Sequence, residues 1–223
     1  MGVAVFGSIA VAIFSYFKHR STAALTERAA GSGNAPCKWL LKWDHQASID
    51  WAASVLSQPD EIAIIDITES GPNPRDEVIE IAVLDGNGSA LFHSLVKPVT
   101  QRINPKFALA HGLQDKDLES APSFAEIAPR LFEALKGRQW IFYQKEFIER
   151  ILKQTCTRYD IDLPGIESTE LRHYLAAYEG EWSPYEGSYR LPSLPGSDCR
   201  AQGDCWIMLD QIRRMAADST LVD

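Results

Sequence analysis

Carboxylates beside apolar runs are the residues of this sequence best suited to chemistry. Asp66 follows Ile62-Ala63-Ile64-Ile65, a run that suits a buried central strand, and Asp204 lies at the start of a late helical pattern. Side chains alternate between the two faces of a strand, so Asp66 and Thr68 share a face whereas Glu69 points to the other. Mg²⁺ and Mn²⁺ prefer oxygen ligands, and such cations can bridge protein carboxylates to a phosphate.

The charge balance restricts the classes of partner. The chain has 223 residues, 45% of them hydrophobic and 23% charged, which fits one globular domain with an extension. The net charge is −8, and the first 36 residues contribute +2, so residues 37–223 carry −10. This body lacks the basic surface of a tight, nonspecific nucleic-acid binder, although bound cations would supply positive charge to an enzyme.

The four cysteines do not form a recognisable framework. Cys37, Cys156, Cys199 and Cys205 include no CxxC pair. A chain of this length with so few cysteines is not a disulfide scaffold, and we expect reduced thiols in a cytosolic compartment.

The N-terminus is apolar. Residues 1–17 carry no charge, and Lys18-His19-Arg20 follows them. This length is at the short limit for a membrane span, and the basic residues after it predict a membrane-associated protein whose domain faces the cytoplasm. An interfacial or partner-bound helix, a misassigned start and a signal peptide are the alternatives. We therefore divide the chain into an apolar helix over 1–20, a linker over 21–36 that is rich in Ala, Gly and Ser, and a domain over 37–223.

Periodicity predicts the elements of the domain. We expect helices over 38–56, 123–135, 147–157, 168–178 and 204–217, and strands over 61–67, 78–84, 90–96 and 140–143. Asp85-Gly86-Asn87-Gly88 predicts a hairpin turn. The expected fold is α/β, with an antiparallel three-strand meander plus parallel strands, flanked by helices. In the first helix we expect Trp39 and Trp43 to pack on the edge of the domain.

Four short motifs indicate a family. They are Asp66-Ile67-Thr68-Glu69-Ser70-Gly71, Tyr143 to Ile148, His111-Gly112-Leu113-Gln114-Asp115 with Ala121-Pro122-Ser123-Phe124 after it, and Cys199 to Asp204. Together they resemble the DnaQ-like DEDDh 3′–5′ exonucleases, which have an RNase H-like fold. The His-Gly-Leu stretch with the Ala-Pro-Ser-Phe that follows is the most specific match, and the resemblance extends from about Trp51 to Ala217.

The resemblance implies a particular chemistry and shows what is missing from it. The family hydrolyses a terminal phosphodiester with two Mg²⁺ or Mn²⁺ ions held by four carboxylates, and a histidine deprotonates the attacking water. Asp66 and Asp204 match two of the carboxylates and would hold any metal that binds. Thr68 stands at the position of the glutamate, Ile148 at that of an aspartate and Cys199 at that of the histidine. An ordinary thiol, with a pKa of about 8.5, is a poor base at neutral pH.

Other carboxylates could rebuild such a site. Glu69 would reach the face of Asp66 only through a β-bulge. Glu146 and Glu149 could turn toward a metal, although we expect both to be solvated. His173 could approach the site, although we expect it to lie at the surface or to have its ring nitrogens hydrogen-bonded elsewhere.

Some candidate substrate contacts remain open between two interpretations. The resemblance places His111 and Phe147 near a terminal nucleotide, whereas a turn cap for His111 and a core position for Phe147 are the structural alternatives. The aromatic segment 180–192 could stack on bases or pack on a partner protein.

The functional hypothesis follows from the substitutions. We expect a catalytically impaired exonuclease-fold domain that serves as a binding or structural subunit, is tethered to a membrane and is part of a protein complex. The alternatives are an active metal-dependent exonuclease on DNA or RNA with a rearranged carboxylate site, and a pure nucleic-acid binder, against which the negative charge argues.

Overall fold

The computed structural model describes residues 37–73, 75–99, 102–165 and 167–219. The apolar helix predicted over 1–20 and the linker over 21–36 lie outside these residues. In the part of the chain that is described, no helix has both the length and the apolar composition needed to cross a membrane.

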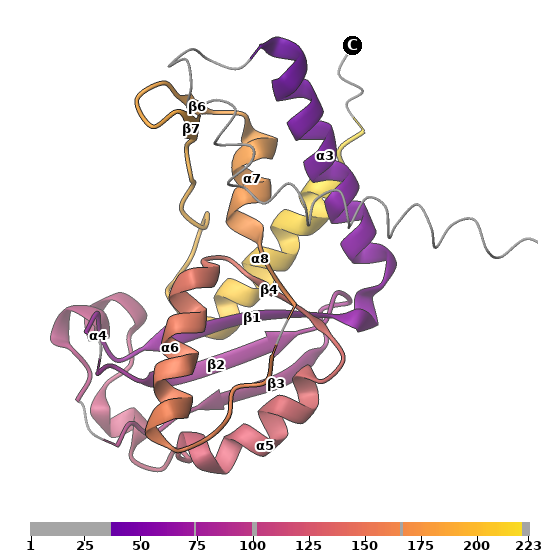
Figure 1. Cartoon of the computed structure of the whole chain (residues 1–223). Helices are drawn as coiled ribbons and strands as arrows, with labels where there is room; N and C mark the ends of the chain where they lie inside the picture. The colour runs from indigo at the N-terminus through magenta and orange to yellow at the C-terminus, as the bar shows by residue number, and fades with distance from the viewer. Residues whose placement is uncertain (1–36, 74, 100–101, 166, 220–223) are drawn as a thin grey trace, which may run out of the picture.

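A five-stranded mixed sheet forms the centre of the domain (Figure 1). Its order is β3-β2-β1-β4-β5, formed by β1 (Ile62–Glu69), β2 (Val78–Leu84), β3 (Ala90–Leu95), β4 (Gln139–Phe142) and β5 (Ser168–Glu170). The first three strands are an antiparallel meander, whereas β4 and β5 continue the sheet from β1 in parallel. The predicted α/β fold with a mixed sheet is confirmed.

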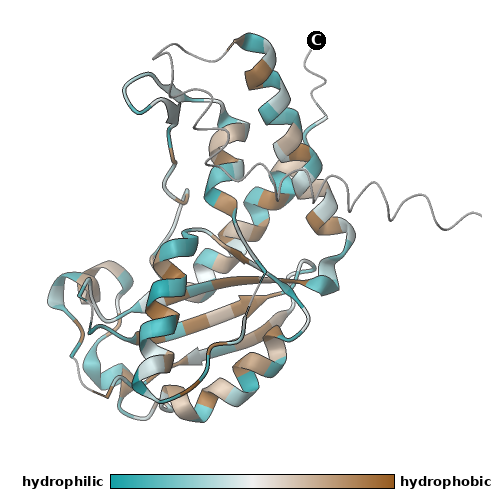
Figure 2. Ribbon diagram, in the orientation of Figure 1, coloured by the Kyte–Doolittle hydropathy of each residue, from teal (hydrophilic) through white to brown (hydrophobic). Residues whose placement is uncertain are grey.

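Helices cover both faces of this sheet. On one face, α5 (Phe124–Leu135) and α6 (Lys145–Arg158) pack on Ala63, Ile65 and Ile67 of β1. On the other, α3 (Lys38–Ser57), α7 (Leu171–Glu179) and α8 (Ala201–Ala216) pack on Ile62 and Ile64. The central strands are consequently apolar on both faces (Figure 2). Asp66 and Thr68 follow Ile62 and Ile64 in the alternation and lie on the face covered by α8.

Short elements complete the domain. They are η1 (Pro59–Glu61), α4 (Pro105–His111), η2 (Asp115–Leu118) and the hairpin β6 (Trp182–Ser183) with β7 (Ser188–Tyr189). The hairpin lies within the aromatic segment 180–192, and the Trp182 and Tyr189 rings pack edge to face with their centroids 5.4 Å apart. The Tyr143 hydroxyl and the Arg172 Nε both donate to the Pro192 carbonyl, at 2.8 and 2.9 Å. These bonds fasten the end of the segment to the domain.

Two expectations from the sequence are wrong. Residues 168–170 form the edge strand β5, not the first turn of a helix, because they pair with β4 in parallel register. Three residues are too few to show an alternating pattern. Trp39 and Trp43 do not pack on the domain, since they are 67% and 55% exposed, and the buried residues of α3 begin at Asp44.

Gly88 in the β2–β3 turn has a backbone that only glycine adopts easily, with φ +93°. A Cβ there would lie 2.7 Å from two ring carbons of Trp206 in α8. We expect Gly88→Ala to reduce the free energy of unfolding by roughly 2–3 kcal/mol, through backbone strain and overpacking together. Gly137→Ala is the matched control, because φ is +73° but no atom lies within 4 Å. Gly137→Ala should reduce the free energy of unfolding, measured by chemical denaturation, by only about 1 kcal/mol. Equal losses in the two variants would show that the contact with Trp206 does not contribute to the effect of Gly88→Ala.

Candidate active site

Asp66 on β1 and Asp204 in the first turn of α8 are brought together on one face of the sheet. Burial, and next the negative charge of Asp204, raise the pKa of Asp66 well above its usual value. Burial also raises the pKa of Asp204, although the Ser197 hydroxyl donates to its Oδ2 at 2.6 Å. The other oxygen, Oδ1, is buried and accepts no hydrogen bond of ordinary geometry from the described residues. The two carboxylates therefore form a site with an excess of negative charge.

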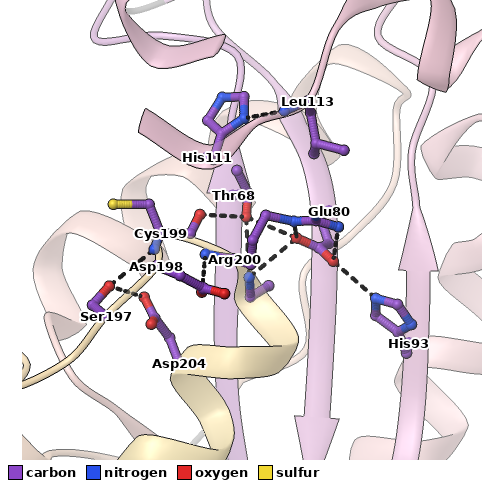
Figure 3. Close-up of polar contacts among 11 residues, drawn as sticks. Thr68, Glu80, His93, His111, Leu113, Ser197, Asp198, Cys199, Arg200 and Asp204 are labelled. Carbon is purple, nitrogen blue, oxygen red and sulfur yellow. Dashed lines mark hydrogen bonds and ion pairs between the residues drawn. The ribbon is translucent and has the colours of Figure 1, made fainter. Parts of the chain in front are cut away.

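Thr68 occupies the same face but serves a structural role (Figure 3). Its hydroxyl lies 3.1 Å from Glu80 Oε2 and 3.3 Å from the Cys199 carbonyl oxygen, and it accepts the Ala201 N–H at 3.1 Å. The side chain is only 3% exposed. Thr68, which the sequence motif aligns with the family's metal-binding glutamate, thus links β1, β2 and the start of α8.

Glu80 on β2 is the centre of this network, a role that was not predicted from the sequence. The Arg200 guanidinium binds it through two bonds, Nε to Oε2 at 2.8 Å and Nη2 to Oε1 at 2.9 Å. His93 Nε2 lies 2.9 Å from Oε1, and the Ala201 N–H donates to Oε2 at 3.1 Å. Burial alone would raise the pKa of Glu80, but the bonds from Arg200 and His93 and the charge of Arg200 lower it to about 2. A lone ionisable residue inside the apolar strand 78–84 was the available signal, because a buried charge requires partners.

The second motif contributes no carboxylate to the Asp66 face. Ile148, which the sequence motif aligns with the family's aspartate, is 2% exposed and belongs to the core formed by α5, α6 and their face of the sheet. Glu146 is exposed on α6. Glu149 Oε1 accepts the Ser168 hydroxyl at 2.6 Å and lies 3.9 Å from Lys145 Nζ. Neither of these two glutamates is therefore placed beside Asp66 as a metal ligand would be.

Glu69 lies at an irregularity of the β1–β2 pairing. Thr68 is paired with Glu80 and Glu69 with Val78, so the extra residue, Ile79, is in β2. The alternation along β1 therefore continues. Burial, and to a lesser extent the charge of Asp76, raise the pKa of Glu69, whereas a backbone hydrogen bond and the charge of Arg150 in α6 partly offset this increase. The negative charge of Glu69 still raises the pKa of Asp66, but less than that of Asp204 does.

Cys199 precedes α8 in an exposed loop. Its φ is +60°, a left-handed conformation that is uncommon for a residue other than glycine. Its N–H donates to the Ser197 hydroxyl at 3.1 Å, and its sulfur points away from Glu80 (Figure 3). Ser197 therefore connects the backbone of Cys199 to the carboxylate of Asp204, a link that was not predicted.

His111 and Phe147 lie in different surroundings. His111 is 5% exposed, and its Nδ1 accepts the Leu113 N–H at 3.1 Å, which is the turn cap considered as an alternative. Burial, and then the charge of Arg200, lower its pKa, so the neutral ring carries its proton on Nε2, which has no partner among the described residues. Phe147 is partly buried against the core, with Arg150 over its ring at 5.2 Å. His173 Nε2 lies 3.6 Å from Oε2 of Glu170, and its side chain is partly exposed.

The residues present fit at most one weakly held cation. Asp66 and Oδ1 of Asp204 offer anionic oxygens that a cation would neutralise. Thr68 and Ile148 offer no such oxygen to a second ion. Within residues 37–219, leaving out the gaps in the described chain, no three His, Cys, Asp or Glu side chains are grouped as metal ligands. The set does not match a two-metal clamp.

The fold and motifs define the class of protein as an RNase H-like exonuclease domain. The family model described as Exonuclease matches residues 64–194, more than half of the chain. The chain therefore belongs to this DnaQ-like exonuclease family.

Similar proteins agree with this assignment. "Uncharacterized exonuclease CP81" of Escherichia phage 186 is 25% identical over 76% of this chain and 95% of its own. "3′-5′ exonuclease DinG" of Staphylococcus haemolyticus (strain JCSC1435) is 27% identical over 59% of this chain, which corresponds to 15% of that protein.

Solved structures share the fold. The nuclease domain of 3′hExo, a DEDDh family member bound to rAMP, is similar with a TM-score of 0.53 and 15% identity over 71% of this chain and 94% of its own. A structure of 3′-end specific recognition of a histone mRNA stem-loop by a 3′-exonuclease gives a TM-score of 0.56 and 13% identity over 70% of this chain. The match covers 63% of that longer chain.

Proposed function

We propose that this chain is a catalytically impaired member of the exonuclease family, which acts as a binding or structural subunit. The proposal rests on the hydrogen bonds and the burial of Thr68. Its neutral side chain is part of a buried network with Glu80 and Ala201. A residue whose hydroxyl is used to connect three elements does not replace a carboxylate ligand of a metal.

Two further positions support the same conclusion. Ile148 is core, and Cys199 supplies a thiol in an exposed loop where the family has its base. Loss of a general base alone typically lowers the rate by a factor of ~10² or more. Without two clamped metals and without the histidine, hydrolysis of a terminal phosphodiester has little left to accelerate it.

The retained scaffold supports a role in binding. The buried Nε2–H of His111 is a donor without a partner in the described structure, and a phosphate or sugar oxygen would satisfy it. The structurally similar 3′-exonuclease with 3′-end specific recognition of a histone mRNA stem-loop makes the 3′ end of a nucleic acid the first ligand to test. A protein partner is the other candidate. The uncharged residues 1–17, with Lys18-His19-Arg20 after them, support tethering to a membrane with the domain in the cytoplasm.

The decisive experiment compares the full chain with Asp66→Ala/Asp204→Ala in one assay. Internally labelled single-stranded DNA and RNA with free 3′ ends are incubated with Mg²⁺ or Mn²⁺. We expect equal rates for the wild type and the double variant, at the level of the buffer. Titration with Mn²⁺, followed by electron paramagnetic resonance, should show at most one weak site, which the double variant lacks. Degradation by the wild type alone would overturn the proposed impairment.

An active enzyme with a rearranged site is the second candidate, and the effect of the Glu69 charge on Asp66 favours it, although Glu69 lies on the other face of β1. Glu69 lies close enough for its charge to raise the pKa of Asp66. If this carboxylate binds a metal, Glu69→Gln should abolish any Mn²⁺-dependent degradation. Glu149→Gln, which changes a carboxylate that already binds Ser168, is the control and should leave that activity unchanged.

A further inference from the structure

The first two turns of α3 present an exposed pair of tryptophans. Trp39 and Trp43 are 67% and 55% exposed, and because they are four residues apart they lie on one face of the helix. The start of α3 is remote from the sheet, next to the β6–β7 hairpin (Figure 1). The Tyr189 hydroxyl of this hairpin donates to Asp44 at 2.7 Å, and Tyr185 at the turn is 98% exposed. Exposed aromatic rings therefore gather at this end of the domain.

The same end of the chain is basic, whereas the rest is strongly acidic. Residues 1–43 contain five basic residues and one acidic residue, a net charge of +4, so residues 44–223 carry −12. The basic residues are Lys18, Arg20, Arg28, Lys38 and Lys42, and the acidic one is Glu27. An anionic surface would attract this end and repel the remainder of the domain.

We infer that the start of α3 lies in the headgroup layer of an anionic membrane, with Trp39 and Trp43 as interfacial anchors and Lys38 and Lys42 beside them. Tryptophan is enriched at membrane–water interfaces, and each lysine near an anionic lipid surface contributes about 1 kcal/mol. This inference rests on the proposed tethering through residues 1–17.

The tether alone would not fix the domain at the membrane. Residues 18–36 separate the apolar segment from α3. Nineteen residues can extend by roughly 65 Å, a reach that would leave the domain free to rotate. Contact of α3 with the lipid surface would instead hold the domain in one orientation.

A second copy of the chain is a weaker candidate for this surface. Two tryptophan side chains bury about 300–500 Å² when they are covered. A stable interface buries about 800 Å² on each partner. Two copies that met at this surface would also bring two basic segments together, and these would repel each other.

The test uses the full chain and vesicles of phosphatidylcholine and phosphatidylglycerol whose acyl chains are brominated near the headgroup. Flotation measures tethering, and quenching of tryptophan emission measures contact of α3 with lipid. The chain has six tryptophans. If all six emit equally, quenching of Trp39 and Trp43 should lower the total tryptophan emission by about a third. Trp39→Phe/Trp43→Phe should float equally well and lose the quenching, whereas Trp206→Phe, at a partly exposed position in α8, should keep it. Lys38→Glu/Lys42→Glu should reduce quenching on anionic vesicles only.

The outcomes separate the two proposals. Flotation of the wild type with no quenching beyond that of the double phenylalanine variant would overturn the role of α3 and leave the tether intact. A chain that does not float overturns the tether and, with it, the inference. Dimers in analytical ultracentrifugation without lipid, abolished by Trp39→Ser/Trp43→Ser, would assign the surface to a second copy.

Discussion

Replacing Arg200 with methionine should destabilise the domain by about 3–5 kcal/mol, because it leaves Glu80 charged, 1% exposed and without its main partner. The network around Thr68 and Ala201 would lose its anchor at the same time. Chemical denaturation at pH 7 measures the effect. Glu80→Met/Arg200→Met should be more stable than either single variant, since it removes both charges of the buried pair. Additive losses would show that the pair is not coupled.

The same pair predicts a dependence on pH. Glu80 has a folded pKa of about 2, below its ordinary value near 4.5, so its contribution is complete above pH 4.5 and is lost as the pH falls toward 2. Arg200→Met should therefore flatten the stability profile in that window. Lys136→Met is the matched control, because its pair with Glu133 is about three-quarters exposed on both sides. It should change stability by no more than ~0.5 kcal/mol.

Asp66→Asn should have the opposite effect and stabilise the domain. The pKa of Asp66 in the folded protein is raised well above its ordinary value. As the pH rises, the unfolded chain therefore loses this proton before the folded protein does. Asp66 consequently lowers the free energy of unfolding between about pH 4 and its folded pKa. The asparagine removes this penalty. We expect a gain on the order of 2 kcal/mol at pH 8, as for removal of a buried uncompensated charge, and no gain at pH 4.

Thermal unfolding at pH 4, 6 and 8 checks this prediction. The exposed Asp162 is the control, and Asp162→Asn should give the wild-type profile at each pH. Mn²⁺ provides a second readout, since a cation held by Asp66 and Asp204 should raise the melting temperature of the wild type at pH 8 and not that of Asp66→Asn. Destabilisation by Asp66→Asn at pH 8 would mean that the ionised carboxylate has a partner that offsets its burial.

Local patterns in the sequence were sufficient for most of the fold. The strand 78–84 has the predicted bounds, and α3, α5, α6 and α8 lie within a few residues of the expected ranges. These elements are long or strongly patterned, so each segment carries its own signal. The turn at 85–88 and the meander followed from residue types alone.

The tertiary structure decided the state of the site. Glu80 and Arg200 are 120 residues apart, and Thr68 contacts a carbonyl 131 residues away, so no local pattern could show that they form one network. The sequence placed Thr68, Ile148 and Cys199 at three positions of the family's chemistry. Only packing showed that Thr68 links three elements, that Ile148 is core, and that Trp39 and Trp43 lie outside the packed part of α3. Residue types determine which groups are available, whereas burial and partners depend on contacts between segments far apart in the chain.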